Sequence, residues 1–517
     1  MIENLLGAAP GSSKCDIAVI GGGTLGLPTA ARLSARGFSV ICLESGGWVQ
    51  KEETHPLNEV VQTRSMYAGA QRGRFRCIGG TSTRWGGALI PFLASDLING
   101  DWPIKPDVLT GYREPVERLF DLPSDNYDAP ELIQPLGTAR THLPRLAKWP
   151  SFRKRNVFNL LESDLRSRSN LRIVLNATVT DFDVVDEHLR AVIARSPDGG
   201  ALRIEARHFV FAAGAIETTR LLLLLDKQNQ NVLSRHGSHL GRNFYDHLSV
   251  LVARLQPLDK AALNRLTGFR FTKGGAMRNL RFELAEENGI RAKCLPCFAH
   301  IAFHEKQDSG FAFLRDILRH VQMRRIPPAR TIARLILSSP WLVRAIWWRL
   351  VEMRLLYPDD ADINVHMVIE QTPRPENRIS LSSERTDLFG RPLAQIDWSV
   401  DKEDQKNLRA AVDLFEDSWN KSNLAAVAQF ERRPPGEAEI ELADGGGVYH
   451  PGGSTRMAHS PADGVVDPDL RVFGLHNTRV VSTSVLPTGG GANPTMMAIM
   501  LAFRCSDDLT RELRTVT

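Results

Sequence analysis

Residues 16–44 read DIAVIGGGTLGLPTAARLSARGFSVICLE, and this stretch decides the fold. It opens with a short apolar run, which is typical of a strand buried on both faces of a parallel sheet. The spacing G-x-G-x-x-G follows at Gly21, Gly23 and Gly26. Apolar residues at helical spacing then run from 25 to 36, with Pro28 in the first turn, where a helix tolerates proline. A second predicted strand ends at Glu44, so the stretch predicts a strand–helix–strand unit of a parallel sheet.

This unit has the chemistry of a dinucleotide site. The glycines allow a tight turn and let the backbone approach a pyrophosphate, to which the helix N-terminus presents free N–H groups and a positive dipole end. Glu44 stands where an acid accepts hydrogen bonds from ribose hydroxyls and repels a 2′-phosphate. The sequence therefore predicts a bound dinucleotide, which at this point is either NAD or FAD.

A second strand-to-helix crossing favours FAD. The apolar run 208–211 leads through Ala212-Ala213-Gly214 into a helix expected from Ala215. A nicotinamide-dependent dehydrogenase needs only one such turn for its phosphates, whereas the larger FAD lies across the sheet. Residues 79–88 add a loop with four glycines, three hydroxyls and a tryptophan. We interpret it as a loop held against a flat ligand, because surface turns rarely place a tryptophan between glycines.

The length of 517 residues predicts two domains, since the chain exceeds one hydrophobic core. We expect the nucleotide-binding domain to comprise 14–100, 155–250 and 445–517, and the substrate-binding domain 101–154 and 251–444. The second domain has alternating strand candidates, such as 362–370 and 378–381, which indicate an antiparallel sheet facing the substrate.

Composition excludes some classes of function. A net charge of +5 is too mild and diffuse to indicate a nucleic-acid partner, and no apolar run is long enough for a transmembrane helix. The N-terminus lacks the basic and apolar segments of a secretory signal, and most of the six cysteines lie in apolar runs, so we expect a cytoplasmic protein with reduced thiols. Cys294 and Cys297 form a C-x-x-C pair without a second pair for a zinc site, and no metal is expected. A redox dithiol is one interpretation, but two packed thiols on a strand are favoured.

An arginine-rich helical insertion is expected at about 311–357. Between Arg315 and Arg354 the chain has nine arginines against only Asp316 and Glu352, a net +7, together with three tryptophans. A helix lying on a membrane surface is one interpretation. A lid or a contact with another subunit is favoured, because Leu342, Ile346, Leu350 and Met353 share one helical face while the arginines are scattered around the others.

The C-terminal region contains two candidate catalytic side chains. His450 stands in a glycine- and proline-rich loop, and Asn493 precedes Pro494 at the start of a predicted helix. This position makes Asn493 a natural helix N-cap. It also places an amide at a loop end beside the first helix. One histidine and one asparagine fixed by such loops can bracket a substrate hydroxyl.

Taken together, these motifs show that the chain resembles the glucose–methanol–choline (GMC) flavin oxidoreductases over nearly its whole length. The resemblance rests on the fingerprint at 21–44, the loop at 79–88, the crossing at 212–214, the motif Gly-Arg-Asn-Phe-Tyr-Asp-His at 241–247, and two C-terminal motifs. These are His-x-Gly-Gly-x-x-Arg-Met from His450 and Gly-Ala-Asn-Pro-Thr ending at Thr495. The Gly-Gly-Thr-Ser-Thr-x-Trp loop is most similar to the sugar-oxidising branch, which includes pyranose oxidases and related sugar dehydrogenases.

The resemblance implies an α/β FAD-binding Rossmann-like domain and a second α+β domain built on an antiparallel sheet. It also implies that an alcohol C–H gives a hydride to flavin N5 while His450 takes the hydroxyl proton and Asn493 hydrogen-bonds the oxygen. The resemblance further implies that the Val179 backbone contacts the adenine and that the ADP half of FAD is bound by Gly23, Thr24, Leu25, Glu44 and Ser45. The pyrophosphate-to-flavin half would be lined by Arg76, Gly80, Thr81, Trp85, Gly86, Gly87 and Ala88. Gly21, Gly26, Ala213 and Thr495 complete the expected cofactor-binding set.

Two departures from the family pattern matter. Pyranose and choline oxidases carry a flavin-linked histidine in the loop, and here that position is Arg84, so FAD is expected to be non-covalent. Ser482-Thr483-Ser484 stands where many members have an acid or a glycine.

The expected function is FAD-dependent oxidation of a primary or secondary alcohol, most simply on a sugar or glycoside, with oxygen or a quinone reoxidising the flavin. Two alternatives stay open. One is a hydrophobic or sterol-type alcohol as substrate, and the other is a flavoprotein subunit that relays electrons within a complex. The sequence leaves the oligomeric state undecided, with a homo-oligomer or a peripheral membrane contact through 315–354 as the options.

Overall fold

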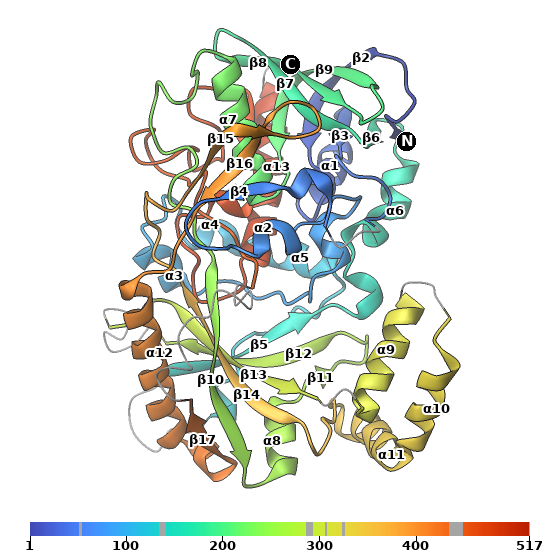
Figure 1. Cartoon of the computed structure of the whole chain (residues 1–517), viewed down its shortest axis with the longest axis vertical. Coiled ribbons are helices and arrows are strands. Elements are labelled where there is room, and N and C mark those ends of the chain that lie inside the picture. Colours follow the sequence, from blue (N-terminus) through green and yellow to red (C-terminus); the bar gives the residue numbers. More distant parts are fainter. Residues whose placement is uncertain are drawn as a thin grey trace.

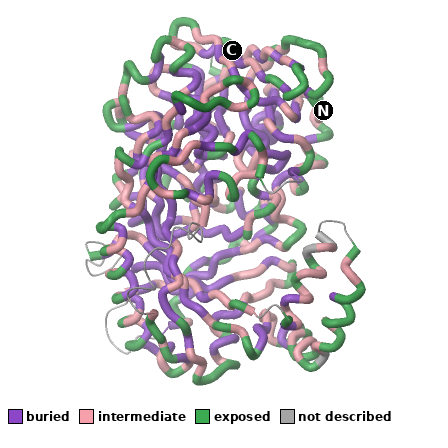
Figure 2. Tube along the Cα trace, viewed as in Figure 1, coloured by how far each residue is buried: buried purple, intermediate pink, exposed green. Residues whose placement is uncertain are grey.

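The computed structural model describes residues 1–50, 54–133, 141–285, 293–305, 308–322, 326–433 and 448–515. Two large sheets, one above the other in Figure 1, form most of the protein. Both are buried along their centres, and the exposed residues gather at the rim (Figure 2). This is the expected architecture: a Rossmann-like α/β domain and a second domain built on an antiparallel sheet.

The α/β domain has an eight-stranded sheet in the order β1-β6-β3-β2-β9-β8-β7, with β18 beside β9. Its strands are β1 (Ile2–Asn4), β2 (Gly11–Ile20), β3 (Val40–Leu43), β6 (Leu171–Leu175), β7 (Thr178–Val185), β8 (His188–Arg195), β9 (Ala201–Phe211) and β18 (Thr478–Val480). All neighbours from β1 to β9 and β18 are parallel, and β9, β8 and β7 are antiparallel. The helices around it are α1 (Gly26–Ser34), α6 (Val157–Ser167), α7 (Ala215–Gln228) and α13 (Thr495–Thr515).

The quoted stretch folds as predicted because every local signal agrees. Residues 17–20 of β2 are buried, and α1 begins at Gly26 and is buried along most of its length. Gly21 has φ +112°, and a Cβ there would lie 2.5 Å from the Ala212 carbonyl oxygen. Only glycine therefore lets the end of β2 pass so close to the second crossing, where Gly214 precedes α7.

The second domain has a seven-stranded antiparallel sheet in the order β11-β12-β13-β14-β10-β17, with β5 beside β12. Its strands are β5 (His142–Trp149), β10 (His247–Pro257), β11 (Arg270–Phe271), β12 (Met277–Leu284), β13 (Cys297–His304), β14 (Asp362–Glu370) and β17 (Ala428–Arg432). One face is apolar and packs on α12 (Lys402–Asn420), where the Phe282 ring lies 5.3 Å from Phe415 and 6.3 Å from Trp419. The strand predicted at 362–370 is β14, with the expected bounds.

The strand candidate at 378–381 belongs to a different sheet from the one expected. It is part of β15 (Arg378–Thr386), which pairs with β16 (Pro392–Asp397), and β16 pairs with β4 (Val60–Gln62) from the N-terminal part of the chain. This three-stranded sheet packs on α7 of the α/β domain. The expectation that 378–381 extends the substrate-facing sheet is therefore wrong, because among the described residues β15 pairs only with the following strand β16, and β16 in turn pairs with the distant β4.

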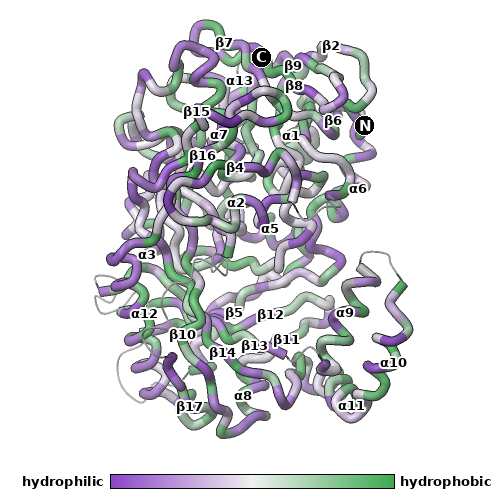
Figure 3. The backbone as a smooth tube through the Cα atoms, in the orientation of Figure 1, coloured by the Kyte–Doolittle hydropathy of each residue, from purple (hydrophilic) through white to green (hydrophobic). Residues whose placement is uncertain are grey.

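The predicted arginine-rich helical segment is three helices, α9 (Gly310–Gln322), α10 (Ala329–Leu337) and α11 (Ser339–Trp347), followed by a π-helical turn, η6 (Trp348–Glu352). They project beside the seven-stranded sheet in Figure 1. Much of their surface is exposed in Figure 2, and α10 combines strongly hydrophilic with strongly hydrophobic residues in Figure 3.

Short helices and turns connect these elements. They are η1 (Pro56–Asn58), α2 (Gly69–Arg72), η2 (Gly80–Thr83), α3 (Ala94–Asn99), α4 (Asp107–Thr110), α5 (Arg113–Leu119), η3 (Pro130–Leu132), η4 (Phe152–Lys154), α8 (Lys260–Thr267), η7 (Asn423–Ala426) and η8 (Thr483–Val485). The cysteines Cys15, Cys42, Cys77 and Cys505 are free, and Cys294 and Cys297 are both buried.

Candidate active site

The strands β2, β3 and β9 end at one edge of the parallel sheet, and we call this edge the candidate cofactor site. Because parallel strands end on one side of a sheet, this edge is where α/β proteins bind nucleotides. Residues around it are mostly buried, but Gly23, Thr24, Leu25, Ser45 and Ala213 keep partial exposure, and Thr81 and Gly214 are exposed. The site thus brings together predicted residues from four separate segments of the chain.

Two glycine-rich loops, the one after β2 and the one at 79–88, meet at this site. The Gly79 N–H donates to the Gly22 carbonyl at 2.9 Å, which ties the loop at 79–88 to the loop after β2. Gly80 has φ +53°, and a Cβ there would lie 2.8 Å from the Gly23 Cα. A side chain at Gly80 would therefore fill the space in which the two loops approach.

Glu44 is buried at the end of β3, as predicted, and it faces the first loop. Its carboxylate accepts the Gly22 N–H at 2.9 Å and the Gly46 N–H at 2.8 Å. Burial raises the pKa of the Glu44 carboxyl, while these two N–H donors lower it. The adenine-side residue Val179 lies on β7, and the chain just before that strand is joined to Glu44 by the Ala177 N–H, which donates to the Glu44 carbonyl at 2.8 Å.

Arg76 is engaged with the protein itself. Its guanidinium donates to Glu217 at 2.7 Å, and three further hydrogen bonds go to the Ser45 hydroxyl, the Asn58 side chain and the Leu57 carbonyl. Glu217 is buried at the start of α7 and also contacts Arg74 and Arg220. Arg76 thus joins the loop before residue 79 to the second crossing.

The loop at 84–88 is held by aromatic contacts. Trp85 donates from Nε1 to the Arg155 carbonyl at 2.8 Å, and its ring lies 5.8 Å from Phe120. Gly87 has φ +94°, Gly86 is exposed, and Ala88 is buried. Arg84, at the position of the family's linked histidine, is exposed and donates to the Gln50 carbonyl at 3.0 Å.

His450 lies in a hydrogen-bonded pair with His247, at the start of β10. The two Nδ1 atoms are 3.3 Å apart, and His247 Nε2 is 2.9 Å from the Gly490 carbonyl oxygen. Since a carbonyl can only accept, His247 carries its proton on Nε2, and its Nδ1 accepts from His450 Nδ1–H. A neutral His450 ring is then left with an unprotonated Nε2, the atom a general base needs.

Asn493 faces that free nitrogen. Its Nδ2 lies 3.1 Å from His450 Nε2 and donates to it, and its Oδ1 accepts a short hydrogen bond from Arg281 on β12. The expectation that Asn493 caps the following helix is wrong, because α13 begins at Thr495 and the Asn493 side chain is engaged by His450 and Arg281. The structure thus brings the two predicted catalytic residues into direct contact.

Arg281 and His247 are site residues that the sequence analysis did not single out. Arg281 is buried 4.4 Å from the Phe298 ring centroid, and it has no ion pair among the described residues. It lies on the polar face of the antiparallel sheet, opposite His300, which in turn lies opposite His366. His247 is the last residue of the motif at 241–247, so the sequence contained a signal for it. No motif or spacing around Arg281 indicates a functional residue.

The surroundings keep His450 neutral. Burial lowers the pKa of His450 well below its usual range, and the nearby His247 and Arg281 lower it further. The backbone N–H of His450 donates to the buried Asp246 carboxylate at 2.6 Å, and this carboxylate also accepts the Tyr67 hydroxyl at 2.7 Å. Burial raises the pKa of Asp246 to about 7. On the other side of the loop, the Thr483 hydroxyl of the Ser482–Ser484 segment donates to the Pro451 carbonyl at 2.7 Å.

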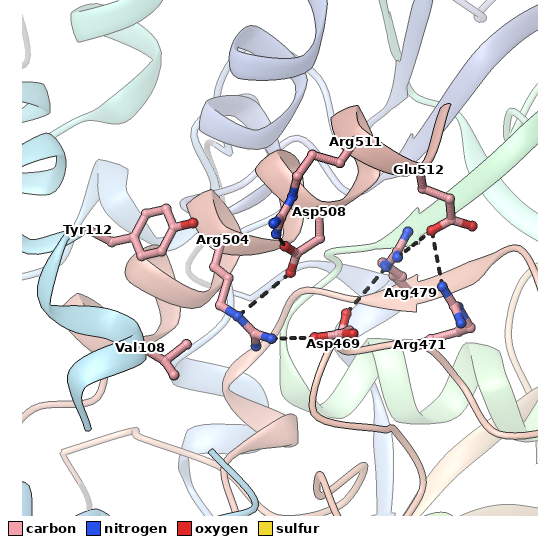
Figure 4. A pocket seen from close by; sticks show the side chains of 9 residues that line it. All are labelled: Val108, Tyr112, Asp469, Arg471, Arg479, Arg504, Asp508, Arg511 and Glu512. Atoms are coloured by element: carbon pink, nitrogen blue, oxygen red, sulfur yellow. Dashed lines mark hydrogen bonds and ion pairs between the residues drawn. The ribbon is translucent and has the colours of Figure 1, made fainter. Parts of the chain in front are cut away.

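The residues present fit FAD. The glycine loops leave room for a pyrophosphate, Glu44 follows β3 where the ribose of a dinucleotide is expected, and Asn493 lies just before α13, which packs on α1. A cavity of about 580 Å³ elsewhere does not share these features (Figure 4). It lies over the C-terminal half of α13, where each arginine is paired with a carboxylate; the pairs join Arg471 and Arg479 to Glu512, Arg504 to Asp469 and Asp508, and Arg511 to Asp508.

Comparison with known proteins gives a consistent result. The profile of the GMC oxidoreductase family matches residues 373–502. The fructose dehydrogenase large subunit of Gluconobacter japonicus is 22% identical over 351 residues, which cover 66% of this chain and 54% of that protein. The 2-methyl-1,2-propanediol dehydrogenase of Mycolicibacterium austroafricanum is 22% identical over 97% of this chain and 96% of its own length.

The fold is also similar to that of a solved oxidase. Pyridoxine 4-oxidase from Mesorbium loti superposes with a TM-score of 0.62 at 18% identity, covering 96% of this chain and 99% of that chain. The match to the fructose dehydrogenase subunit spans only about half of that relative's length.

Proposed function

We propose that the chain is a GMC oxidoreductase, as the match over residues 373–502 supports, and that it oxidises an alcohol group of a small molecule with FAD as its cofactor. The contact between His450 Nε2 and Asn493 Nδ2, at 3.1 Å, carries this proposal. An unprotonated nitrogen and an amide N–H so close together suit a single oxygen atom that gives up a proton and gains negative charge.

The proposed roles follow from these atoms. A substrate hydroxyl donates to His450 Nε2 and accepts from Asn493 Nδ2–H, and His450 takes the proton as the carbonyl forms. His247 accepts from His450 Nδ1–H, which fixes the ring orientation, and Arg281 fixes the Asn493 amide so that its N–H group faces the oxygen. When bound, FAD supplies the acceptor for the hydride that leaves the carbinol carbon.

A sugar or glycoside is the substrate class that the polar face of the sheet supports. Arg281, His300 and His366 follow one another across three strands on the face that carries the contact to Asn493. His300 Nδ1 and His366 Nε2 are buried and have no hydrogen-bond partner within the described part of the chain. Several hydroxyl groups on one ligand would satisfy such atoms, whereas a sterol-type alcohol would leave them unpaired.

We further propose a cytoplasmic protein, which the free cysteines Cys15, Cys42, Cys77 and Cys505 support. Oxygen or a quinone is the proposed acceptor for the electrons. The experiment that tests the function is anaerobic mixing of the purified protein with a panel of sugars, glycosides and apolar alcohols. Bleaching of the flavin by sugars is the expected result. A flavin that no alcohol bleaches would contradict the proposal and favour an electron-relay subunit.

We expect the FAD to be non-covalently bound. Arg84 replaces the histidine that forms the flavin bond in some relatives, and its guanidinium cannot form that bond. Acid precipitation of the yellow protein should therefore release the flavin into the supernatant, where its absorbance is measured. Flavin absorbance that stays with the denatured pellet would contradict this prediction.

Replacing Arg281 should weaken catalysis through Asn493. Arg281→Met frees the amide to rotate, so flavin reduction should slow by up to about 10²-fold, the lower end of the cost of losing a direct oxyanion donor. Arg281 lowers the pKa of His450, so its removal should raise that pKa. On acidification the variant should therefore lose activity at a higher pH than the wild-type protein does. Stopped-flow reduction across a pH series measures both effects.

The matched control is Arg278→Met, an arginine of the same strand three residues away, whose side chain lies on the opposite face. Arg281→Lys should restore part of the rate, since it keeps a charge and a donor. An Arg281→Met enzyme with a normal rate and an unshifted pH profile would show that Arg281 does not position Asn493.

A further inference from the structure

The helix α10 turns its apolar residues toward solvent. At 100° per residue, Ile332 and Ile336 share a stripe with Ala329, Ala333 and Leu337, and Ile336 and Leu337 are 63% and 82% exposed. Thr331 is buried, on the opposite side of the helix. A helix that only packed on this protein would bury the stripe, so this face is adapted to contact something else.

The next helix has the same property. Val343, Ile346, Trp347, Leu350 and Val351 follow the spacing i, i+3, i+4, i+7, i+8 along α11 and η6, and all five are exposed. Trp348, just beside the stripe in sequence, is buried against the body of the protein. The structure therefore corrects the sequence-based assignment of the apolar face to residues that include Leu342 and Met353, which are only partly exposed.

This concentration is specific to one segment of the chain. Of the 21 large hydrophobic side chains that are exposed among the described residues, ten lie between 318 and 351. The remaining eleven are spread over the rest of the chain, as isolated exposed residues normally are. We call the stripes of α10, α11 and η6 together the apolar ridge; its members are Ile332, Ile336, Leu337, Val343, Ile346, Trp347, Leu350 and Val351.

Arginines border the apolar ridge. Arg330 and Arg334 are exposed at the edge of the α10 stripe, and Arg344 is exposed on α11. The ion pairs of Arg334 with Asp308 and of Arg344 with Asp359 lie at the surface, where water and salt weaken them. The stretch from Arg315 to Arg354 has nine arginines and two acids, so it carries a net +7.

We propose that the apolar ridge is a docking surface for an anionic phospholipid membrane, with α10, α11 and η6 lying in the plane of the headgroups. Amphipathic helices with arginine-bordered apolar faces and an exposed tryptophan have this mode of binding. None of the described helices has both the length and the apolar character needed to cross a bilayer, which fits attachment from one side.

Charge argues for lipid over a second copy of the chain. A symmetric contact through the apolar ridge would bring the bordering arginines of two copies together, and like charges at close range oppose such an interface. Anionic headgroups are complementary to both features of the surface, because they neutralise the arginines while the acyl boundary takes the apolar side chains.

Flotation with vesicles tests this proposal on the full-length, FAD-loaded protein. It should float with vesicles of phosphatidylcholine containing about one-third phosphatidylserine and stay behind with pure phosphatidylcholine. Binding should fall as salt rises from about 0.05 to about 0.5 M, since screening shortens the reach of the arginines. Trp347 should be quenched by lipids brominated near the headgroups, with Trp347→Phe as the blank.

Two variants separate the contributions of the surface. Ile336→Glu/Leu350→Glu should abolish binding, and Arg330→Glu/Arg334→Glu should weaken it at least about 30-fold, since each arginine near an anionic surface contributes about fivefold. Leu258→Glu is the matched control, because Leu258 is 59% exposed outside the apolar ridge. Unchanged FAD content and melting temperature show that the variants fold.

Three results would overturn the proposal. They are failure of the wild-type protein to float with anionic vesicles, equal flotation of the Ile336→Glu/Leu350→Glu variant, and a smaller mass of that variant by light scattering. The last result would assign the apolar ridge to a contact between copies of the chain. None of these measurements depends on substrate oxidation, so they stand apart from the proposed enzymatic function.

Discussion

Replacing His450 with alanine should leave FAD bound and slow the reduction of the flavin by substrate by about 10²–10⁴-fold, the range for losing a positioned general base. The proposed base is His450 Nε2, which the contact to His247 leaves unprotonated and which lies 3.1 Å from Asn493 Nδ2. Anaerobic stopped-flow absorbance measures the rate, and the flavin spectrum reports FAD occupancy.

The pH dependence sharpens this prediction. Because burial, His247 and Arg281 hold the pKa of His450 well below its usual range, the base stays neutral as the pH falls through 6.5. The wild-type rate of flavin reduction should therefore show no loss near pH 6.5 and should decline only at lower pH. His459→Ala serves as the control. This histidine follows the motif that begins at His450, but within the described residues it makes no hydrogen bond to His247, His450 or Asn493. A normal rate in His450→Ala would refute the assignment of the base.

Replacing Glu217 with glutamine should destabilise the protein by about 3–5 kcal/mol, the cost of breaking a buried ion pair from one side. Glu217 is buried where Arg74, Arg76 and Arg220 converge, so its loss leaves buried positive charge without its main partner. Urea denaturation followed by fluorescence gives the free energy of unfolding. FAD occupancy should fall as well, because the cluster joins the loop before residue 79 to the second crossing.

The pH dependence of the free energy of unfolding gives an independent test of the role of Glu217. The three arginines outweigh burial and lower the pKa of Glu217 to about 2, against about 4.3 in an unfolded chain. A lowered pKa stabilises the folded state above the unfolded pKa, so the contribution is lost as the pH falls from about 4.5 to about 2. Wild type and variant should therefore converge in stability over that window. Glu114→Gln, which removes an exposed pair with Arg118, should change stability by less than about 1 kcal/mol; an equal loss in both variants would contradict the prediction.

The sequence predicted the parts of the fold whose signals are local. The β2–α1–β3 unit, the crossing at 212–214 and the bounds of β14 agree with the structure, because buried strands, glycine turns and helix starts are written in consecutive residues. The second domain was also predicted in kind, as an antiparallel sheet. Long-range pairing was not: β15 joins a sheet through β16 to β4, more than 300 residues earlier.

The candidate site shows the same limit at the level of side chains. His450 and Asn493 were found because each stands in a distinctive glycine-rich loop, and the structure brings them into contact. Local reasoning gave Asn493 a capping role, yet its amide is engaged by Arg281, which is 212 positions away in the chain. Tertiary contact decided the outcome over local propensity, and no spacing rule could have identified Arg281.

For the surface of α10 and α11 the sequence left the binding partner undecided, and the reason is physical. A helical pattern identifies an apolar stripe, but it does not say what the stripe faces. The sequence favoured a lid or a contact with another subunit, and a membrane surface stayed open as the alternative. In the structure Thr331 and Trp348 are buried, while the stripes are exposed.

The central claim is that the His450–Asn493 pair removes a proton from an alcohol while its carbinol hydrogen leaves as a hydride to FAD. The most direct measurement is the anaerobic rate of flavin reduction by the fastest-reacting sugar of the panel, compared with the same sugar carrying deuterium on the oxidised carbon. The account predicts that the deuterated sugar reduces the flavin severalfold more slowly in the wild-type protein. Equal rates for the two sugars when bond cleavage limits the rate, as in the slowed Arg281→Met enzyme, would contradict it.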